Sequence, residues 1–203
     1  MKLWYSPASP FVRKVLVLAH ETGLADRLTI VEANTNVVNR NEELAKDNPT
    51  GKIPAMVLDD GTVLFDSRVI CAYLDSLHNG KKLTPSGGDV ASFRLMALEA
   101  LGDAIMDAGV LTRYEQALRP KEKHWDKWEA GQLLKVNTSL DDLEARWMDL
   151  LEGPMHTGTI AVASGLGYLD YRFADMGWRD SRPKLAAWYE KFSARPSMQA
   201  TKP

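Results

Sequence analysis

The spacing of apolar residues changes character part-way along the chain. In the first part, short apolar runs typical of strands alternate with stretches of helical spacing, whereas the second part shows helical spacing alone. Asp60-Gly61 lies between two of the short runs, and Asp-Gly in that position predicts a β-hairpin. The order βαβ, then ββα, then helices alone predicts an α/β domain followed by an all-α domain. The predicted elements are strands at 2–5, 28–31, 55–58 and 62–65, and helices at 10–21, from 67 onward, and at 90–118, 122–151, 159–173 and 183–193.

A polar segment separates the two parts of the chain. Residues 79–89, NGKKLTPSGGD, are rich in glycine and interrupted by a proline, which is typical of a linker. We therefore predict a first domain at 1–78, a linker at 79–89 and a helical domain at 90–203.

The composition excludes several classes of protein. Hydrophobic residues make up 45% and charged residues 26% of the 203 positions, and the net charge is −2, so neither a nucleic acid nor an anionic membrane is predicted as a partner. The single cysteine, Cys71, excludes an internal disulfide and a thiolate-rich metal site, and we interpret it as a buried structural thiol. No apolar run is long enough for a signal peptide or a membrane span, which predicts a cytoplasmic protein.

The stretch SPASPFVRK stands where the first predicted strand meets the first predicted helix. Ser9 and Val12 occupy the two positions that hold cysteines in the Cys-x-x-Cys motif of thiol-disulfide enzymes. One interpretation is local: Ser9 caps the helix and Pro10 is its first residue. The other is chemical: a hydroxyl at the positive end of a helix can donate to a thiolate carried by a bound small molecule.

Two further segments allow a structural and a functional interpretation. In NPTGKIPAM, Pro54 precedes a predicted strand. A trans proline would simply start that strand, whereas a cis Ile53-Pro54 bond would expose the Ile53 backbone to an extended peptide ligand. In FDSRVI, Asp66 and Ser67 stand where the hairpin leads into a helix, with Ser67 predicted as the N-cap. Such a pair either caps the helix or holds the ammonium and carboxylate of an amino-acid backbone.

The segments SPFVRKV, NPTGKIPAM, FDSRVICAYLD and ALEALGDAIMDAG, in this order, resemble the cytosolic glutathione transferases, including their bacterial YibF-like branch. The resemblance covers essentially the whole chain. It implies a thioredoxin-like N-terminal domain, an all-helical C-terminal domain and a homodimer. It also implies a detoxifying glutathione S-transferase that uses glutathione as co-substrate, without a prosthetic group or metal, on small hydrophobic electrophiles.

The resemblance also implies roles for individual residues. Ser9 would donate a hydrogen bond to the glutathione sulfur, and Ile53, held by a cis-Pro54, would pair with the cysteinyl unit. Asp66 and Ser67 would bind the γ-glutamyl ammonium and carboxylate. Lys52 and Asn34 would bind the glycine carboxylate, and Asp103 would assist the γ-glutamyl amine across the dimer interface. Candidates for the electrophile pocket are Phe11, Met106, Val110, Thr112 and Tyr114.

Several alternatives stay open at this point. Ser6 or Tyr5 could contact the thiol in place of Ser9, and each electrophile-pocket candidate could be ordinary core. The same thiolate would serve peroxide reduction, dehalogenation or isomerisation, and a non-catalytic ligand- or protein-binding module would use the same fold. Thr159 keeps the Thr of a capping pair that many family members have at the start of a core helix, but Val162 replaces its acidic partner.

Overall fold

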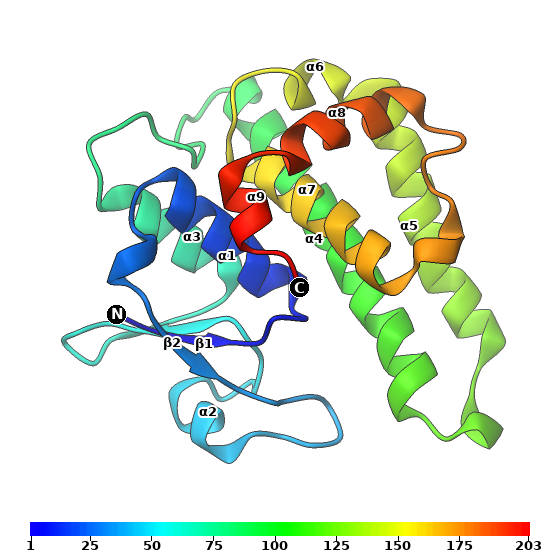
Figure 1. Ribbon diagram of the computed structural model, residues 1–203, viewed down its shortest axis with the longest axis horizontal. Helices are drawn as coiled ribbons and strands as arrows, with labels where there is room; N and C mark the ends of the chain where they lie inside the picture. Colours follow the sequence, from blue (N-terminus) through cyan, green and yellow to red (C-terminus); the bar gives the residue numbers. More distant parts are fainter. The chain divides into compact units, whose positions relative to one another are not determined.

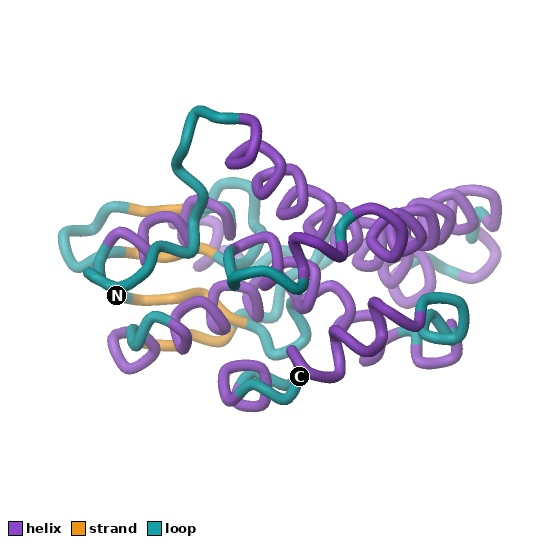
Figure 2. The backbone as a smooth tube through the Cα atoms, turned by 90° about the horizontal axis from the view of Figure 1, so that it is seen from above, coloured by secondary structure: helices purple, strands orange, loops and turns teal.

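The computed structural model describes residues 1–203 and divides into two compact units. The N-terminal unit comprises residues 1–84 and 196–203, and the helical unit comprises residues 85–195. Figures 1 and 2 show the mixture of strands and helices in the first unit and the helices of the second. The sequence prediction assigned all of 90–203 to the helical domain, and the last eight of these residues lie instead in the N-terminal unit.

A four-stranded mixed sheet forms the centre of the N-terminal unit, in the order β2-β1-β3-β4. β1 runs parallel to β2 and antiparallel to β3, and β3 runs antiparallel to β4. Helices α1 and α3 lie on one side of this sheet and α2 on the other (Figure 1). This arrangement confirms the predicted thioredoxin-like fold. The strands are β1 (Lys2–Tyr5), β2 (Thr29–Glu32), β3 (Ala55–Val57) and β4 (Val63–Leu64), and the helices are α1 (Pro10–Glu21), α2 (Glu42–Asp47) and α3 (Ser67–Ser76).

Alternation along β1 supplies both sides of the sheet with apolar side chains. Leu3 is completely buried, and Trp4, on the opposite face, joins a cluster with Ala33, Leu44 and Ala55. Leu44 is the only buried residue of α2, a helix of six residues that the sequence analysis missed. Asn41 caps this helix, since its side chain accepts a hydrogen bond from the Leu44 amide at 2.9 Å.

Two glycines with positive φ lie at a helix end and in a hairpin. Gly23, at φ 70°, follows α1, and the amides of Gly23 and Leu24 donate to His20 and Ala19 in a Schellman arrangement. Gly61, at φ 88°, lies in the predicted hairpin between β3 and β4. Both positions favour glycine because the left-handed region is costly for residues with a Cβ.

The C-terminal helix α9 (Pro196–Ala200), which was not predicted, is fastened to α1 by buried polar contacts. The Arg13 side chain is 6% exposed and donates to the Met198 carbonyl at 3.1 Å. The Ser197 hydroxyl donates to the Glu21 carboxylate at 2.5 Å. Arg13 therefore has a structural role: it holds α9 against α1.

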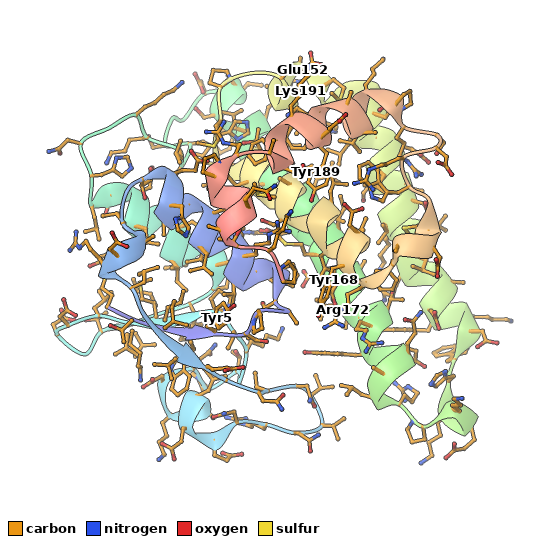
Figure 3. The ribbon with its side chains drawn as sticks, viewed as in Figure 1. Tyr5, Glu152, Tyr168, Arg172, Tyr189 and Lys191 are labelled. Atoms are coloured by element: carbon orange, nitrogen blue, oxygen red, sulfur yellow. The ribbon has the colours of Figure 1, made fainter.

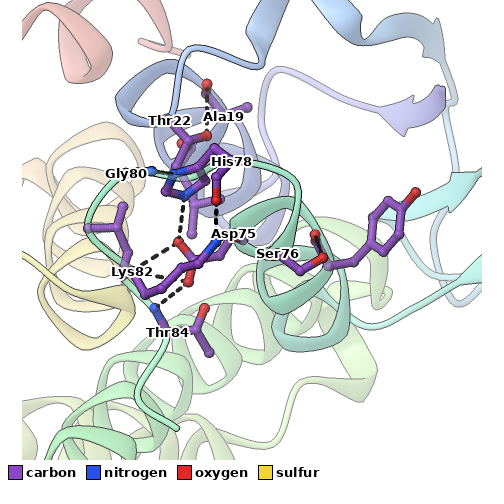
Figure 4. Close-up of polar contacts among 11 residues, drawn as sticks. Ala19, Thr22, Asp75, Ser76, His78, Gly80, Lys82 and Thr84 are labelled. Atoms are coloured by element: carbon purple, nitrogen blue, oxygen red, sulfur yellow. Dashed lines mark hydrogen bonds and ion pairs between the residues drawn. The ribbon is translucent and has the colours of Figure 1, made fainter.

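Asp75, near the end of α3, fastens the first part of the predicted linker to the N-terminal unit (Figure 4). Its buried carboxylate accepts hydrogen bonds from the amides of Leu83 and Thr84, both at 3.0 Å, and lies 2.9 Å from His78 Nε2. Burial alone would raise the pKa of Asp75, but these backbone and imidazole contacts outweigh it and lower the pKa. Lys82 adds donations to the carbonyls of Asp75 and His78. The chain is thus held in place up to Thr84.

The helical unit is built on the close approach of α4 and α7. A Cβ added to Gly102 of α4 would lie 2.6 Å from the Val162 nitrogen and 2.7 Å from the Ala161 carbonyl carbon of α7, so only glycine fits between these backbones. The predicted helix 122–151 is two helices, because the backbone breaks at Trp147. The helices of this unit are α4 (Val90–Leu118), α5 (Asp126–Arg146), α6 (Met148–Leu151), α7 (Thr157–Arg172) and α8 (Pro183–Ser193), and it contains short 3-10 turns at Lys121–Lys123 and Ala174–Met176. A further 3-10 turn, Ala25–Arg27, lies in the N-terminal unit.

Helix α7 begins with a reciprocal cap that the sequence analysis placed wrongly. His156 is the N-cap: its Nδ1 accepts from the Gly158 amide at 3.1 Å, while Thr159 Oγ1 accepts from the His156 amide at 3.1 Å. Thr159 therefore closes the cap from inside the helix and needs no acid at Val162. Burial lowers the pKa of His156, although the Leu150 carbonyl and Glu99 favour its charged form. The neutral ring keeps Nδ1 available as an acceptor.

No helix of the structure is both long enough and apolar enough to cross a membrane. No group of three or more His, Cys, Asp or Glu side chains is arranged to hold a metal ion.

Candidate functional site

Strand pairing brings the three candidate segments of the N-terminal unit to one edge of the sheet. β3 is antiparallel to β1, with Trp4 opposite Ala55, so the turn that precedes β3 lies beside the end of β1. β4 is antiparallel to β3, with Leu64 opposite Met56, so the segment that follows β4 lies beside the same turn. Three segments that are far apart in the sequence therefore meet at one place. They are the start of α1, the Ile53-Pro54 turn and the start of α3.

Ser9 is the N-cap of α1, as the local interpretation predicted. Its backbone is extended, with φ −85° and ψ 118°, and its Oγ accepts from the Val12 amide at 3.3 Å. Pro10 is the first helical residue. The Ser9 side chain is partly exposed, and its hydroxyl proton has no acceptor within the chain. Capping and donation to a ligand are therefore compatible, because the oxygen accepts from the helix while the proton remains available.

The turn before β3 contains the cis bond that the functional interpretation required. The Ile53-Pro54 peptide is cis. Neither the amide nor the carbonyl of Ile53 has a hydrogen-bond partner within the chain, although the side chain packs against the cluster around Trp4. An unpaired backbone donor and acceptor are what an added strand requires.

Asp66, rather than Ser67, caps α3. The Asp66 Oδ1 accepts from the Arg68 amide at 2.9 Å, and the Phe65-Asp66 peptide preceding it is also cis. Ser67 is the first residue of the helix and is only 2% exposed. The prediction of Ser67 as N-cap was wrong because Asp and Ser cap equally well and the sequence places both at the boundary. The exposed Asp66 thus presents a carboxylate at this edge of the sheet.

Lys52 and Asn34 lie on exposed loops of the same unit. The loop that carries Lys52 is ordered by Asn48, which is buried and donates from Nδ2 to the Lys52 carbonyl at 2.8 Å. The Lys52 ammonium has no ion-pair partner in the chain, and Asn34 makes no side-chain hydrogen bond. Both side chains are therefore available to a ligand.

The two alternative residues for the thiol differ in their surroundings. Tyr5 ends β1 (Figure 3), and burial, together with the negative charge of Glu32, raises the pKa of its phenol. Tyr5 lies on the strand and not at the start of α1. Ser6 is partly exposed, but it precedes the helix, and its carbonyl accepts from the Ser9 amide at 3.1 Å. Only Ser9 combines a free hydroxyl proton with the first turn of α1.

The residues predicted for the electrophile pocket separate into two groups. Met106 and Thr112 are completely buried, and Thr112 Oγ1 donates to the Ala108 carbonyl at 2.9 Å, so both belong to the core. Val110 and Tyr114 of α4 are partly exposed, as is Phe11 in the N-terminal unit. Burial raises the pKa of the Tyr114 phenol. Asp103 is 4% exposed, so its carboxylate is not presented to solvent.

A hollow of about 810 Å³ lies in the helical unit between the α6–α7 loop and α8. Leu151, Trp188 and Phe192 line it, and Glu152 and Lys191, labelled in Figure 3, stand on its wall. None of the residues predicted for the glutathione or electrophile sites lines this hollow. The candidate site therefore lies at the sheet edge of the N-terminal unit.

The chain is similar to known proteins over part or all of its length. The family model "Glutathione S-transferase, N-terminal domain" matches residues 8–77, which include all three segments. The uncharacterized GST-like protein YibF of Escherichia coli (strain K12) is 36% identical over 100% of this chain and 98% of its own length. The chain belongs to the glutathione S-transferase family.

Solved structures of this transferase family share the fold over the whole chain. A family member from Pseudomonas fluorescens Pf-5 with bound glutathione is 50% identical, with a TM-score of 0.97 over 100% of this chain and 98% of that one. A structure of a Pseudomonas fluorescens Pf-5 family member with bound S-(propanoic acid)-glutathione is 49% identical, with a TM-score of 0.92 over 100% and 99% of the two chains. Both units of the present transferase-family chain thus have counterparts in these relatives.

Proposed function

We propose that this chain binds reduced glutathione at the sheet edge of the N-terminal unit and transfers it to small electrophiles. The observation that carries this proposal is the convergence of Ser9, the cis Ile53-Pro54 turn and Asp66 at one edge of the sheet. Together they supply a donor for a sulfur, an unpaired backbone for a peptide and an anion for an ammonium. Relatives that contain bound glutathione support the choice of ligand.

The first turn of α1 accounts for the chemistry of the thiol. A free thiol of this type has a pKa of about 8.5, and the positive end of a helix lowers such a pKa into the range of about 3.5–7.5. Lowering the pKa by about 2 corresponds to about 2.7 kcal/mol, which one or two hydrogen bonds to a charged acceptor supply. The Ser9 hydroxyl and the helix terminus therefore suffice to make the thiolate the main species at neutral pH.

The rest of glutathione meets groups suited to its charges. The Ile53 backbone pairs with the cysteinyl unit as an added strand, and Asp66 holds the γ-glutamyl ammonium. Amides at the start of α3, with the Ser67 hydroxyl, hold the γ-glutamyl carboxylate. Lys52 and Asn34 bind the glycine carboxylate. Asp103 is left out of this set because it belongs to the helical unit, whereas the groups named here belong to the N-terminal unit.

The reaction needs only the thiolate and a positioned electrophile. The thiol proton passes to solvent, and the sulfur lone pair forms a bond to an electrophilic carbon. Either a leaving group departs with its bonding electrons, or a conjugated double bond accepts them and takes a proton. The relative that holds S-(propanoic acid)-glutathione supports a product joined through sulfur. We infer a cytoplasmic, detoxifying role from the same chemistry.

Thermal melting with reduced glutathione tests the binding site directly. A ligand at a hundred times its dissociation constant stabilises a protein by about 2.7 kcal/mol, so millimolar glutathione is expected to raise the melting temperature. Asp66→Ala is expected to reduce this rise strongly, because it removes the partner of the γ-glutamyl ammonium. Isothermal titration of the same variant gives the change in affinity.

Asp89→Ala is the matched control. Asp89 caps α4 as Asp66 caps α3, with its Oδ1 accepting from the Ser92 amide at 2.8 Å. Both substitutions therefore cost a helix cap, about 1 kcal/mol. Only Asp66→Ala is expected to weaken the response to glutathione. An unchanged response in Asp66→Ala would remove Asp66 from the site, and no response in the unmodified protein would favour a non-catalytic module.

We also propose that two copies of the chain associate through α4. Exposed apolar and small residues recur along this helix at alternating intervals of three and four at Val90, Phe93, Ala97, Ala100 and Ala104, and Leu111 follows seven residues later. Val90 and Phe93 are 78% and 58% exposed, which is high for large apolar side chains on a helix with this spacing. A second copy would cover this seam across a two-fold axis.

Analytical ultracentrifugation is expected to give about twice the chain mass of 22.6 kDa at micromolar concentration. Ala100→Arg places a charge in the middle of the seam and is expected to yield monomers. Ala130→Arg adds the same charge to an exposed position of α5 and should leave the mass unchanged. A protein that is monomeric without substitution would refute the dimer.

A further inference from the structure

Helix α8 presents aromatic and cationic side chains to the hollow of the helical unit. Trp188 and Phe192 are one turn apart and both 8% exposed, so they form the base of the hollow together with Leu151. Lys184 lies one turn before Trp188 and Lys191 lies one turn after it on the same face of the helix, and both lysines are exposed. The hollow therefore has an apolar base with a cation on either side of Trp188.

Hydrogen bonding and ring packing hold this base in place. The Trp188 indole donates from Nε1 to the Leu151 carbonyl at 2.7 Å, which ties α8 to the end of α6. The rings of Trp188 and Phe192 pack together with their centroids 5.1 Å apart. Because the indole N–H is already bonded within the chain, the two rings offer a ligand only apolar surface.

The charges around the hollow favour an anion. Lys184, Lys191 and Arg195 line it together with a single carboxylate, that of Glu152. Neither lysine forms an ion pair within the chain, and neither does Glu152, which is labelled with Lys191 in Figure 3. Three cations against one carboxylate give the hollow an excess of positive charge, in a chain whose net charge is −2. The two lysines would therefore attract a bound anion without a competing internal partner.

The N-terminus of α8 adds little to this attraction. The Glu144 carboxylate accepts hydrogen bonds from the amides of Lys184 and Leu185 at 3.1 and 2.7 Å, so the first turn of the helix already has its anion. An anion in the hollow would thus be held by the lysine side chains and not by the helix terminus.

We propose that the hollow binds an amphipathic carboxylate, whose apolar body lies against Trp188 and Phe192 and whose carboxylate is held by Lys184 and Lys191. The volume of about 810 Å³ is within the range of about 300–1,000 Å³ that is typical of small-molecule sites. A singly charged head group suits the hollow better than a dianionic phosphate, because Glu152 stands on the same wall. All these residues belong to the helical unit, so this site goes beyond the proposed transferase function and does not depend on it.

Two probes that differ in charge test the proposal. The probes 1-naphthaleneacetate and 1-naphthaleneacetamide share one apolar body, and only the first carries a carboxylate. Isothermal titration of the unmodified protein at low ionic strength is expected to show that the carboxylate probe binds about fivefold more tightly, the size expected for two partly exposed ion pairs. The difference is expected to shrink as salt is added, because salt screens exposed charges. Equal affinities for the two probes at low ionic strength would overturn the proposal.

Substitutions on the wall of the hollow are expected to change the affinity for 1-naphthaleneacetate in opposite directions. Lys184→Gln and Lys191→Gln should each lower it, and the double variant should bind the two probes equally. Glu152→Gln removes the one repelling charge and should raise it about twofold. Lys127→Gln is the matched control, since it removes an exposed lysine of α5 that does not line the hollow, and it should change neither affinity. All four positions are exposed, so the melting temperature is expected to stay the same.

Competition with glutathione separates the hollow from the sheet edge of the N-terminal unit. Saturating glutathione, at matched ionic strength, is expected to leave the affinity for 1-naphthaleneacetate unchanged. If glutathione displaces the probe, or if the double lysine variant still prefers the carboxylate probe, the probe binds elsewhere and the proposal is wrong. If glutathione does not bind the unmodified protein while the lysine-dependent binding of the probe persists, the proposed transferase function is wrong and the carboxylate site stands.

Discussion

Ser9→Ala is expected to lower the turnover of a glutathione conjugation by about 100-fold or more, because losing one donor to a developing or stabilised anion costs about 10²–10³ in kcat. Glutathione affinity should change much less, since the lost hydrogen bond serves the thiolate rather than the peptide. The pH at which the rate reaches half its maximum should move upward, because the bound thiol loses a donor that lowers its pKa. Stopped-flow or steady-state rates across pH 5–9, with glutathione affinity from calorimetry, measure both effects.

Three further variants separate the thiol role of Ser9 from its capping role. Ser9→Thr keeps a hydroxyl and a capable N-cap, and is expected to recover much of the activity. Ser6→Ala and Tyr5→Phe should retain activity, because both residues precede the helix and its N-cap. Full activity in Ser9→Ala, together with a loss in either of the other two, would assign the thiol contact to that residue instead.

Gly102→Ala is expected to be the most destabilising single-methyl change in the helical unit. The new Cβ would lie 2.6 Å from the Val162 nitrogen and 2.7 Å from the Ala161 carbonyl carbon. Both atoms belong to the backbone of α7, so relief requires that the helices separate rather than that a side chain turn away. Overpacking of this kind costs about 3 kcal/mol in the free energy of unfolding. Urea denaturation followed by circular dichroism at 222 nm measures that loss.

Gly131→Ala, the same substitution in another helix, is expected to raise the free energy of unfolding rather than lower it. Gly131 is inside α5, and a Cβ there would meet nothing within 4 Å. Alanine has the higher helix propensity, so this variant should gain up to about 1 kcal/mol. If Gly102→Ala were as stable as the unmodified protein, the close approach of α4 and α7 would be wrong.

The elements that were predicted well have strong local signals. Helix α4 runs from Val90 to Leu118 as predicted because its periodicity is long, and α8 begins at Pro183 because proline suits the first turn. Helix α2 was missed because six residues with one buried side chain, Leu44, give no readable period. The break at Trp147 was missed because the apolar spacing continues across it, although the backbone does not.

The segments of the candidate site could be predicted from the sequence, but their local geometry could not. Ser9, Pro54 and Asp66 carry local signals for a cap, a turn and a helix start, but the sequence left the isomer of Pro54 open and placed the cap on Ser67. Packing decides such points, since the local chain favours a trans proline and allows a serine cap as readily as an aspartate cap.

The attachment of α9 to α1 makes the helical unit an insertion within the N-terminal unit. The chain leaves the N-terminal unit after Thr84 and returns to it at Pro196. A fragment that ends at Thr84 would therefore lack part of its own core and leave the buried Arg13 without the Met198 carbonyl. A shorter protein that retains the N-terminal unit would have to join Thr84 to Pro196 through a new loop. Such a protein would keep both segments of the unit, residues 1–84 and 196–203.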